Sequence, residues 1–346
     1  MRWNFHGLTV EGLWDDAAIG ERWQATFASR PLVEASPDLV FRLALTSEVP
    51  PAPSIPPAYQ QGELLAYYVN GPYVIAHFPR FGQLQLDLAR GPSTEPALSM
   101  SKGSGRGSTV GAITPNALAA YGVFEDLLAI GLSPHFRRRG LFLLHAFAAA
   151  APLSAKFADG GGQGRGLGVL LVGDIGAGKT TTGLALLHAG WKLLSNDSPI
   201  LTLTPHSNSP TVLSYPGLLS AYPDTLARFP ELASLAAPQA ERQKTLFAAE
   251  SIYPDVWADS ARPAAIFFPQ VVDRHPHADA LEKLRPAEAL PLLLPHAVEQ
   301  WDRKMIPAHL ALLKQLVEAA PAYRLRLGPD VNSIPALLLD AVDQRT

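Results

Sequence analysis

Short runs rich in apolar and aromatic residues mark the first part of the chain. Residues 64–69, 73–78 and 84–88 have this pattern and predict three β-strands. Asn70 and Gly71 stand between the first two runs, and both residue types tolerate the positive φ angles of a tight turn. The pattern therefore predicts a hairpin that continues into a β-meander.

Two segments of this region have the composition of connectors. Residues 48–59 are rich in proline, which lacks the N–H group that a central strand needs, so we expect an extended surface connector there. Residues 99–111 combine glycine and serine, which favours a flexible loop. The GSGRG sequence within it also offers glycines for a phosphate-binding turn, but no predicted strand leads directly into it.

Helical spacing begins at Thr114. This residue has the side chain of an N-cap, and Pro115 fits the first helical position. The predicted helical segment ends at the arginines of positions 137–139, where cations interact favourably with the helix dipole; contact with an anionic ligand is the alternative. We therefore expect a β-rich N-terminal region over residues 1–113 and a second domain over residues 114–346.

The second domain alternates buried strands with helices. A glycine-rich insertion, residues 158–168, is expected to join two strands as a long hairpin. The apolar runs predict strands at 141–149, 168–173, 264–272 and 323–327, and helices at 287–302 and 307–321.

Composition restricts the classes of function. A chain of 346 residues with 47% apolar content can bury a full core. The net charge of -3 gives no electrostatic footprint for nucleic acid, so we expect no nucleic-acid partner. No apolar run is long enough to cross a bilayer and the first residues do not read as a signal peptide, so we expect no membrane association and a cytoplasmic location. With 0 cysteines, disulfides and Cys-ligated metal sites are excluded.

A glycine-rich motif stands at the centre of the chain. A predicted strand leads into it, and a predicted helix follows it and ends at Gly190. Glycines let backbone N–H groups turn toward phosphate oxygens, and the helix N-terminus adds positive potential. The sequence GDIGAGKT matches G-x-x-x-x-G-K-[ST] over Gly173, Asp174, Ile175, Gly176, Ala177, Gly178, Lys179 and Thr180.

The motif predicts a nucleotide site for ATP and Mg²⁺. Lys179 would bridge the β- and γ-phosphates, Thr180 would bind Mg²⁺, and Thr181 would complete the nucleotide contacts. The alternative is a glycine-rich turn with an accidental lysine, but strand, loop and helix follow one another in the order that a nucleotide site requires.

An acidic motif follows the predicted helix directly, in GWKLLSNDSPIL at residues 190–201. Together with the loop and with RRRGLFLLHAFAAA at residues 137–150, it resembles the catalytic domain of HPr kinase/phosphorylase and its wider group. Those proteins pair a glycine-rich loop with a nearby Asp-Asp and place a histidine in the active site. The resemblance covers residues 115–340. It implies an α/β fold with a P-loop core of the HPr kinase and phosphoenolpyruvate carboxykinase type, a mixed β-rich sheet with flanking helices.

The resemblance assigns roles to single positions. His145 would face the terminal phosphate, and Asp197 matches the second family aspartate, so these two and Lys179 would be catalytic. Asn196 stands at the first family aspartate; its amide can ligate a metal but cannot accept a proton. Thr180, Asp197 and Asn196 would therefore hold the metal. The residues alone leave open a core histidine at 145 and a surface turn at 196–199.

Four more residues stand in weaker patterns that bear on a functional role. Arg242 and Lys244 would neutralise the transferred phosphate, as basic residues of that region do in similar proteins, or they are solvated charges. His275 and His277 lie in a proline-containing loop without a third ligand, which argues against a metal site.

The leading hypothesis is an ATP-dependent kinase that transfers the γ-phosphoryl group to a serine-type hydroxyl of a peptide, protein or small molecule. The Glu-x-Arg-Gly signature of the true enzyme is absent near residues 215–217, so we expect a relative rather than the sugar-regulatory enzyme itself. The alternative is a nucleotide-binding regulatory or assembly module with little transfer activity. A carboxykinase-like enzyme ranks last, because no arginine set for oxaloacetate is recognisable. The resemblance also implies a homo-oligomer.

Overall fold

The computed structural model describes residues 1–89, 107–152, 166–204, 207–236, 243–272 and 280–343. The chain divides into two compact units. Unit 1 comprises Met1–Phe142 and Glu299–Pro307, and unit 2 comprises Leu143–Val298 and Ala308–Thr346. Among the described residues, no helix combines the length and the apolarity needed to span a bilayer.

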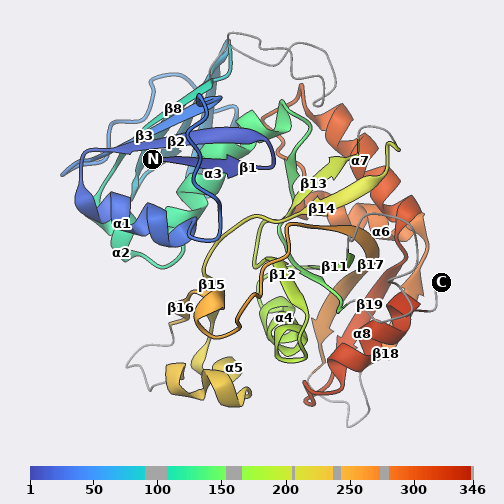
Figure 1. Ribbon diagram of the computed structural model, residues 1–346. Helices are drawn as coiled ribbons and strands as arrows, with labels where there is room; N and C mark the ends of the chain where they lie inside the picture. The colour runs from blue at the N-terminus through green and yellow to red at the C-terminus, as the bar shows by residue number, and fades with distance from the viewer. Residues whose placement is uncertain (90–106, 153–165, 205–206, 237–242, 273–279, 344–346) are drawn as a thin grey trace. The chain divides into compact units, whose positions relative to one another are not determined.

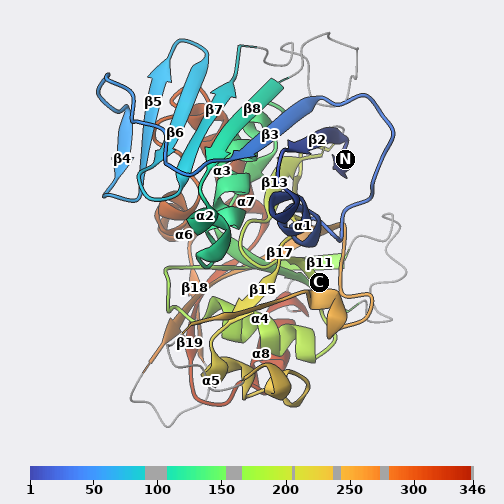
Figure 2. The same cartoon turned by 90° about the vertical axis from the view of Figure 1, so that its left-hand side faces the viewer.

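Unit 1 is built on one sheet with the strand order β1-β2-β3-β8-β7-β6-β5-β4. Strands β3, β8, β7, β6, β5 and β4 lie side by side in this order in Figure 2. Helices α1 and α3 pack against its strands. The elements are β1 (Arg2–Phe5), β2 (Leu8–Trp14), α1 (Ala17–Thr26), β3 (Leu39–Leu45), β4 (Tyr59–Gln61), β5 (Leu65–Asn70), β6 (Tyr73–Phe78), β7 (Gly82–Asp87), β8 (Gly107–Ile113), α2 (Pro115–Ala119) and α3 (Val123–Arg137).

The predicted meander is confirmed, with its turn displaced by one residue. Strands β5, β6 and β7 pair antiparallel in sequence order, and Asn70 pairs with Tyr73. The two turn residues are therefore Gly71 and Pro72 rather than Asn70 and Gly71. Gly71 has a φ of 59°, and proline cannot adopt a positive φ, so the turn has the pattern of type II′.

The prediction of a loop over residues 99–111 is wrong where the structure describes it. Gly107 to Gly111 belong to β8, which pairs with β3 and β7; residues 90–106 lie outside the described part of the chain. The glycines here make room for neighbours. A Cβ at Gly107 would lie 2.6 Å from Nδ1 of His135 on α3, and one at Gly111 would lie 2.5 Å from Cδ2 of Leu84.

The helical segment from residue 114 is two helices, because the chain turns at Gly122, whose φ is 73°. Pro115 starts α2 as predicted, but Thr114 makes no cap hydrogen bond with its side chain. Its hydroxyl instead donates to the carbonyl of Phe81, at 3.3 Å. The arginines at positions 137–139 end α3, and their side chains pair with carboxylates of the protein itself, Asp302 and Asp38.

Unit 2 has a mixed sheet in the order β12-β10-β11-β17-β14-β13-β9, to which β19 and β18 are added beside β17. Strands β11, β17 and β19 are parallel, and the other pairings described are antiparallel. The elements are β9 (Phe142–Leu143), β10 (Ala146–Ala150), β11 (Gly166–Val172), α4 (Lys179–His188), β12 (Lys192–Ser195), β13 (Ile200–Leu203), β14 (Pro210–Leu213), β15 (Leu219–Ala221), α5 (Pro223–Leu226), β16 (Thr245–Phe247), β17 (Ser260–Val271), β18 (Ala280–Leu284), α6 (Pro286–Leu293), α7 (Ile306–Ala319), β19 (Ala322–Leu327) and α8 (Ile334–Asp343).

This architecture confirms an α/β fold with a mixed sheet and flanking helices. The predicted strand at 141–149 is interrupted, since Leu144 and His145 separate β9 from β10. The predicted helix at 287–302 is shorter than expected. It ends at Leu293 and continues only as the 3₁₀ turn Leu294–His296, where Pro295 cannot supply a helical hydrogen bond.

Close packing fixes helix α4 against the sheet. Helix α4 contacts β10 and β11, and α8 lies beside it (Figure 1). Phe147 of β10 is fully buried, and its ring faces Gly183 of α4. Because Gly183 has no side chain, the aromatic ring can touch the helix backbone, and this contact sets the distance between α4 and the sheet.

Gly183→Ala tests this contact. The new Cβ would lie 2.4 Å from Phe147 ring atoms that cannot move freely inside the core. Overpacking outweighs the better helix propensity of alanine, so the free energy of unfolding should fall by about 1–2 kcal/mol. Urea denaturation measures it. Gly217→Ala is the control, because its Cβ would meet no atom within 4 Å. Equal stabilities of the two variants would contradict the close approach.

Candidate functional site

The glycine-rich loop joins β11 to α4, and its conformation depends on two glycines. Gly176 and Gly178 have φ angles of 85° and 102°, a region that other residues rarely adopt. A Cβ at Gly178 would also lie 2.4 Å from Cδ1 of Leu327. Ala177 donates its N–H to the carbonyl of Asp174 at 3.2 Å, which closes the loop on itself. The side chain of Ile175 stands 89% exposed at the tip.

The N-terminus of α4 presents backbone donors next to this loop. The first hydrogen bond within the helix runs from the N–H of Thr182 to the carbonyl of Gly178, at 2.9 Å. The N–H groups of Lys179, Thr180 and Thr181 therefore have no carbonyl one turn earlier to bond to. Together with the helix dipole, they create the positive potential that attracts an anion. The hydroxyl of Thr181 lies 3.4 Å from that of Thr225.

The side chain of Lys179 folds back over the loop. Its Nζ donates to the carbonyl of Gly173 and to the carbonyl of Asp174, the latter at 3.2 Å. A third contact joins Nζ to Nε2 of His145, at 3.3 Å. Lys179 thus contacts both the loop and His145, the residue directly before β10.

His145 links this lysine to Asp197. Its Nδ1 lies 3.2 Å from Oδ1 of Asp197, and the two side chains are 42% and 51% exposed. A lysine ammonium can only donate a hydrogen bond and a carboxylate can only accept one. Both contacts are satisfied when His145 is neutral, with its proton on Nδ1 and its lone pair on Nε2. The site therefore contains a directed chain of hydrogen bonds from Lys179 through His145 to Asp197.

The backbone fixes His145 from two sides. The N–H groups of Leu144 and Ala146 donate to the carbonyls of Pro199 and Asp197, at 3.0 and 2.9 Å. The N–H of His145 points the opposite way, as expected in extended chain, and donates to the carbonyl of His296 at 2.7 Å. The segment of residues 144–146 is therefore held between the acidic turn and the 3₁₀ turn that ends at His296.

His296 is a site residue that the sequence did not reveal. Its ring stacks on that of His145 with centroids 6.0 Å apart, and its Nε2 lies 3.8 Å from Oδ1 of Asp174. Burial lowers the pKa of His296; the neighbouring His145 and Lys179 act in the same direction, and the carboxylate of Asp174 opposes them. No motif surrounds this histidine in the sequence, and only the fold brings it to the loop.

Asn196 is oriented by one hydrogen bond. Its Nδ2 donates to the carbonyl of Leu218 at 3.2 Å, which assigns Oδ1 to the other side of the amide. That oxygen is buried and accepts no hydrogen bond from the described residues. An unpaired buried acceptor beside Asp197 fits a site that a cation completes, because Mg²⁺ takes oxygen ligands. Within the described ranges, however, no group of three or more His and acidic residues is placed to hold a metal.

The charges of the site act on one another. Withdrawal from water raises the pKa of Asp197, but the hydrogen bond from His145 and the charge of Lys179 outweigh it, and the pKa lies below the usual range. The pKa of Lys179 is lowered, chiefly by burial. The carboxylate of Asp197 raises this pKa, and the positive charge of Lys244 lowers it further. The carboxylate of Asp197 thus favours the charged form of Lys179.

Lys244 belongs to this charge cluster. It influences the pKa values of both Lys179 and Asp197, and its Nζ lies 5.4 Å from the ring centre of Tyr222. Arg242, His275 and His277, which the sequence also singled out, lie outside the described residues.

Comparisons with known proteins give little further guidance. No family model and no curated protein matches the chain. Among solved structures, it is similar to the Hpr(Ser) kinase/phosphatase from Coxiella burnetii, with 14% sequence identity over 59% of this chain and 89% of that chain. The TM-score of this match is 0.29.

Competitive acylation of lysines tests the coupling of Lys179 to Asp197. Only the uncharged amine reacts, so the lowered pKa should move the labelling curve of Lys179 to a pH below the ordinary lysine value of about 10.4. Asp197→Asn removes a carboxylate that raises this pKa, and the curve should move lower still. Mass spectrometry of the labelled peptides gives the curve.

The control is Asp340→Asn, which changes an exposed carboxylate on α8 and should leave the curve of Lys179 in place. A shift to higher pH in Asp197→Asn, or no shift, would contradict the coupling.

Proposed function

We propose that the chain is an ATP-dependent, magnesium-requiring kinase that transfers the γ-phosphoryl group to a serine-type hydroxyl of a peptide, protein or small molecule. The observation that carries the proposal is the chain of hydrogen bonds from Lys179 through His145 to Asp197. Nucleotide binding alone needs the loop and the lysine. A neutral histidine, oriented by a carboxylate and directed at the same lysine, is suited to accept a proton.

ATP binding would use the loop and the first turn of α4. The N–H groups around Gly178 and Lys179 would surround the β-phosphate, as helix N-termini do with anions. Lys179 would leave the carbonyls of Gly173 and Asp174 and turn to the β- and γ-phosphate oxygens, which offer full negative charges in place of carbonyl dipoles.

This movement of Lys179 would uncover the lone pair of His145. While the lysine donates to Nε2, the histidine cannot accept another proton. With the lysine on the phosphates, Nε2 would face the side from which a hydroxyl attacks. Binding of the nucleotide would therefore prepare the base.

Transfer would then proceed with the acceptor hydroxyl in line with the bond that breaks. The hydroxyl oxygen bonds to the γ-phosphorus, the bond from that phosphorus to the β-phosphate oxygen breaks, and ADP leaves. The hydroxyl proton passes to Nε2 of His145, and Asp197 stabilises the imidazolium through its contact with Nδ1. A hydroxyl acceptor needs such a base because it loses a proton as it attacks, whereas a carboxylate acceptor does not.

The residues near Asn196 fit the metal that such a reaction uses. Thr180, Asp197 and Asn196 would hold Mg²⁺, and the buried unpaired Oδ1 of Asn196 is the observation that supports this set. When bound there, the ion would supply positive charge against the phosphates of ATP. A cytoplasmic location, where ATP is available, belongs to the same proposal.

The proposal is tested with ATP labelled at the γ-phosphate, Mg²⁺ and a cell extract or peptide library. Label should reach an acceptor, and Lys179→Ala should reduce transfer by at least about 100-fold, because charge stabilisation is lost. His145→Ala should reduce transfer by about 10²–10⁴-fold while ATP binding persists. Lys314→Ala changes an exposed lysine on α7 and should keep full activity.

Two outcomes would decide against the kinase, and a third would decide against the role of His145. ATP binding without any transfer would favour a regulatory or assembly module, the second candidate, which the neutral Asn196 supports. Transfer to water alone would indicate an ATPase. Full activity of His145→Ala would remove the histidine from the reaction.

Asn196→Asp tests the metal set. A carboxylate in place of the amide adds a negative charge next to the Asp197 carboxylate, so half-maximal transfer should need less Mg²⁺. Asn196→Ala removes the amide oxygen, so its half-maximal transfer should need a higher Mg²⁺ concentration. Transfer measured against Mg²⁺ concentration gives both values. If Asn196→Ala leaves the Mg²⁺ requirement unchanged, Asn196 is not a ligand.

A further inference from the structure

Two segments of the chain that pass between the units lie next to the proposed site in sequence. One runs from Arg137 in unit 1 to His145 in unit 2, and the other runs from His296 in unit 2 to Asp302 in unit 1. The two segments are joined to each other at both ends. This arrangement connects a buried ion pair of unit 1 with the residue that we propose as the base.

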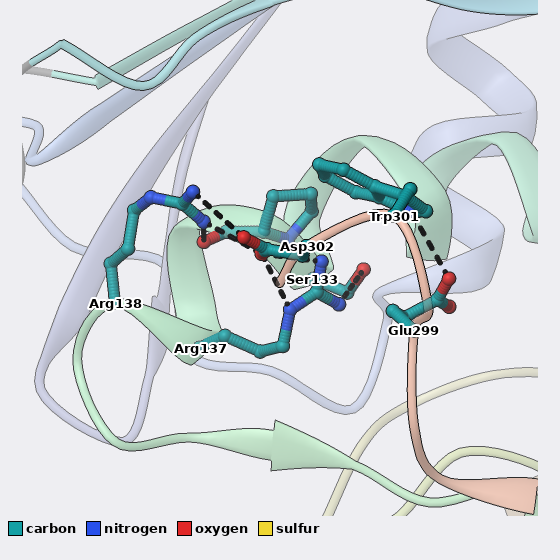
Figure 3. Close-up of polar contacts among 7 residues, drawn as sticks. Ser133, Arg137, Arg138, Glu299, Trp301 and Asp302 are labelled. Atoms are coloured by element: carbon teal, nitrogen blue, oxygen red, sulfur yellow. Dashed lines mark hydrogen bonds and ion pairs between the residues drawn. The ribbon is translucent and has the colours of Figure 1, made fainter. Parts of the chain in front are cut away.

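The junction in unit 1 is a carboxylate between two guanidinium groups (Figure 3). Oδ2 of Asp302 accepts from Nε of Arg137 at 3.0 Å and from Nη1 of Arg138 at 2.9 Å, and Oδ1 accepts from Nη2 of Arg138 at 3.1 Å. The side chains of Arg137 and Asp302 are each 4% exposed. A buried carboxylate paired in this way is strongly held, since its loss would leave buried positive charge without a partner.

Aromatic contacts hold the same segment in unit 1. Trp301 stacks on Tyr67 with centroids 4.8 Å apart, and the guanidinium carbon of Arg137 lies 5.2 Å from the centre of the Trp301 ring. The indole N–H of Trp301 donates to Glu299 at 3.1 Å. The segment that leaves His296 is therefore fixed within a few residues.

The junction in unit 2 is the pair His145 and His296. The N–H of His145 donates to the carbonyl of His296 at 2.7 Å, and the two rings are stacked. Six sequence positions separate His296 from Asp302, and eight separate Arg137 from His145. Because an extended chain spans at most about 3.6 Å per residue, each segment is a short covalent link between the two junctions.

We propose that Asp302 is a positioning residue for His145. By joining the two segments in unit 1, it keeps the N–H of His145 on the carbonyl of His296, and so keeps Nδ1 of His145 on Asp197. This inference rests on the proposed function for its catalytic meaning, while the structural coupling stands independently of it.

The test compares backbone amide hydrogen exchange in the full chain for wild type, Asp302→Asn and Glu125→Gln. Glu125 of α3 forms an ion pair with Arg22 of α1, so its variant controls for the loss of an ion pair in unit 1. In Asp302→Asn, the amide of His145 should exchange at least about tenfold faster, because its bond opens locally, while amides of β11 keep their protection. In Glu125→Gln, the amide of His145 should stay at the wild-type rate.

If Asp302→Asn does not fold, Arg138→Gln replaces it in the hydrogen-exchange test. It leaves the pair of Arg137 and Asp302 in place and should accelerate exchange at His145 in the same direction, to a smaller extent. Unchanged exchange at His145 in either folded variant overturns the proposal, as does equal acceleration in Glu125→Gln.

Kinetics separate this proposal from the proposed function. If the chain is a kinase, Asp302→Asn should lower kcat and leave the KM for ATP unchanged, because the loop and Lys179 are untouched. A chain without any transfer activity would contradict the kinase, and the exchange result would still decide whether Asp302 positions His145.

Discussion

The site depends on three consecutive backbone N–H groups that donate alternately to two different segments. Leu144 and Ala146 donate to the segment that carries Asp197, and His145 donates to the carbonyl of His296 on the other side. An extended backbone alternates its hydrogen bonds in this way, so one short stretch of chain can join two segments that are far apart in sequence. These bonds fix the backbone that carries the imidazole of His145. The contacts of Lys179 and Asp197 with its two ring nitrogens then favour one tautomer.

The electrostatics follow from a neutral imidazole between a cation and an anion. Lys179 donates to one ring nitrogen and Asp197 accepts from the other, so the chain of hydrogen bonds has a single direction. Binding an anion to the loop would draw Lys179 away and leave the other half of the chain intact. In this way the lysine would act both in binding and in timing. In the proposed reaction, Nε2 of His145 would become available as a base only after Lys179 had moved to the phosphates.

Local sequence signals predicted the parts of this structure that depend on neighbours in the chain. The strand, loop and helix around Gly178 follow from residues that stand side by side, and so does the meander of unit 1. The hairpin turn was displaced by one residue because Asn70 keeps its place in the β5–β6 ladder, pairing with Tyr73, which leaves Gly71 and Pro72 to turn. The division of the chain at residues 113 and 114, and a homo-oligomer, stay predictions.

Long-range packing explains what the sequence did not reveal. Gly107 and Gly111 resemble a flexible linker in composition, yet they are small because His135 and Leu84 lie against them in the folded protein. His296 and Asp302 carry no motif, and their importance comes from residues more than a hundred positions away.

The most direct measurement is the protonation of His145 by ¹⁵N NMR of the labelled protein at neutral pH. The chain from Lys179 to Asp197 predicts a neutral ring with its proton on Nδ1 and a bare Nε2. A proton on Nε2, in either the other neutral form or the imidazolium, would contradict the account, because Lys179 could then not donate to this nitrogen.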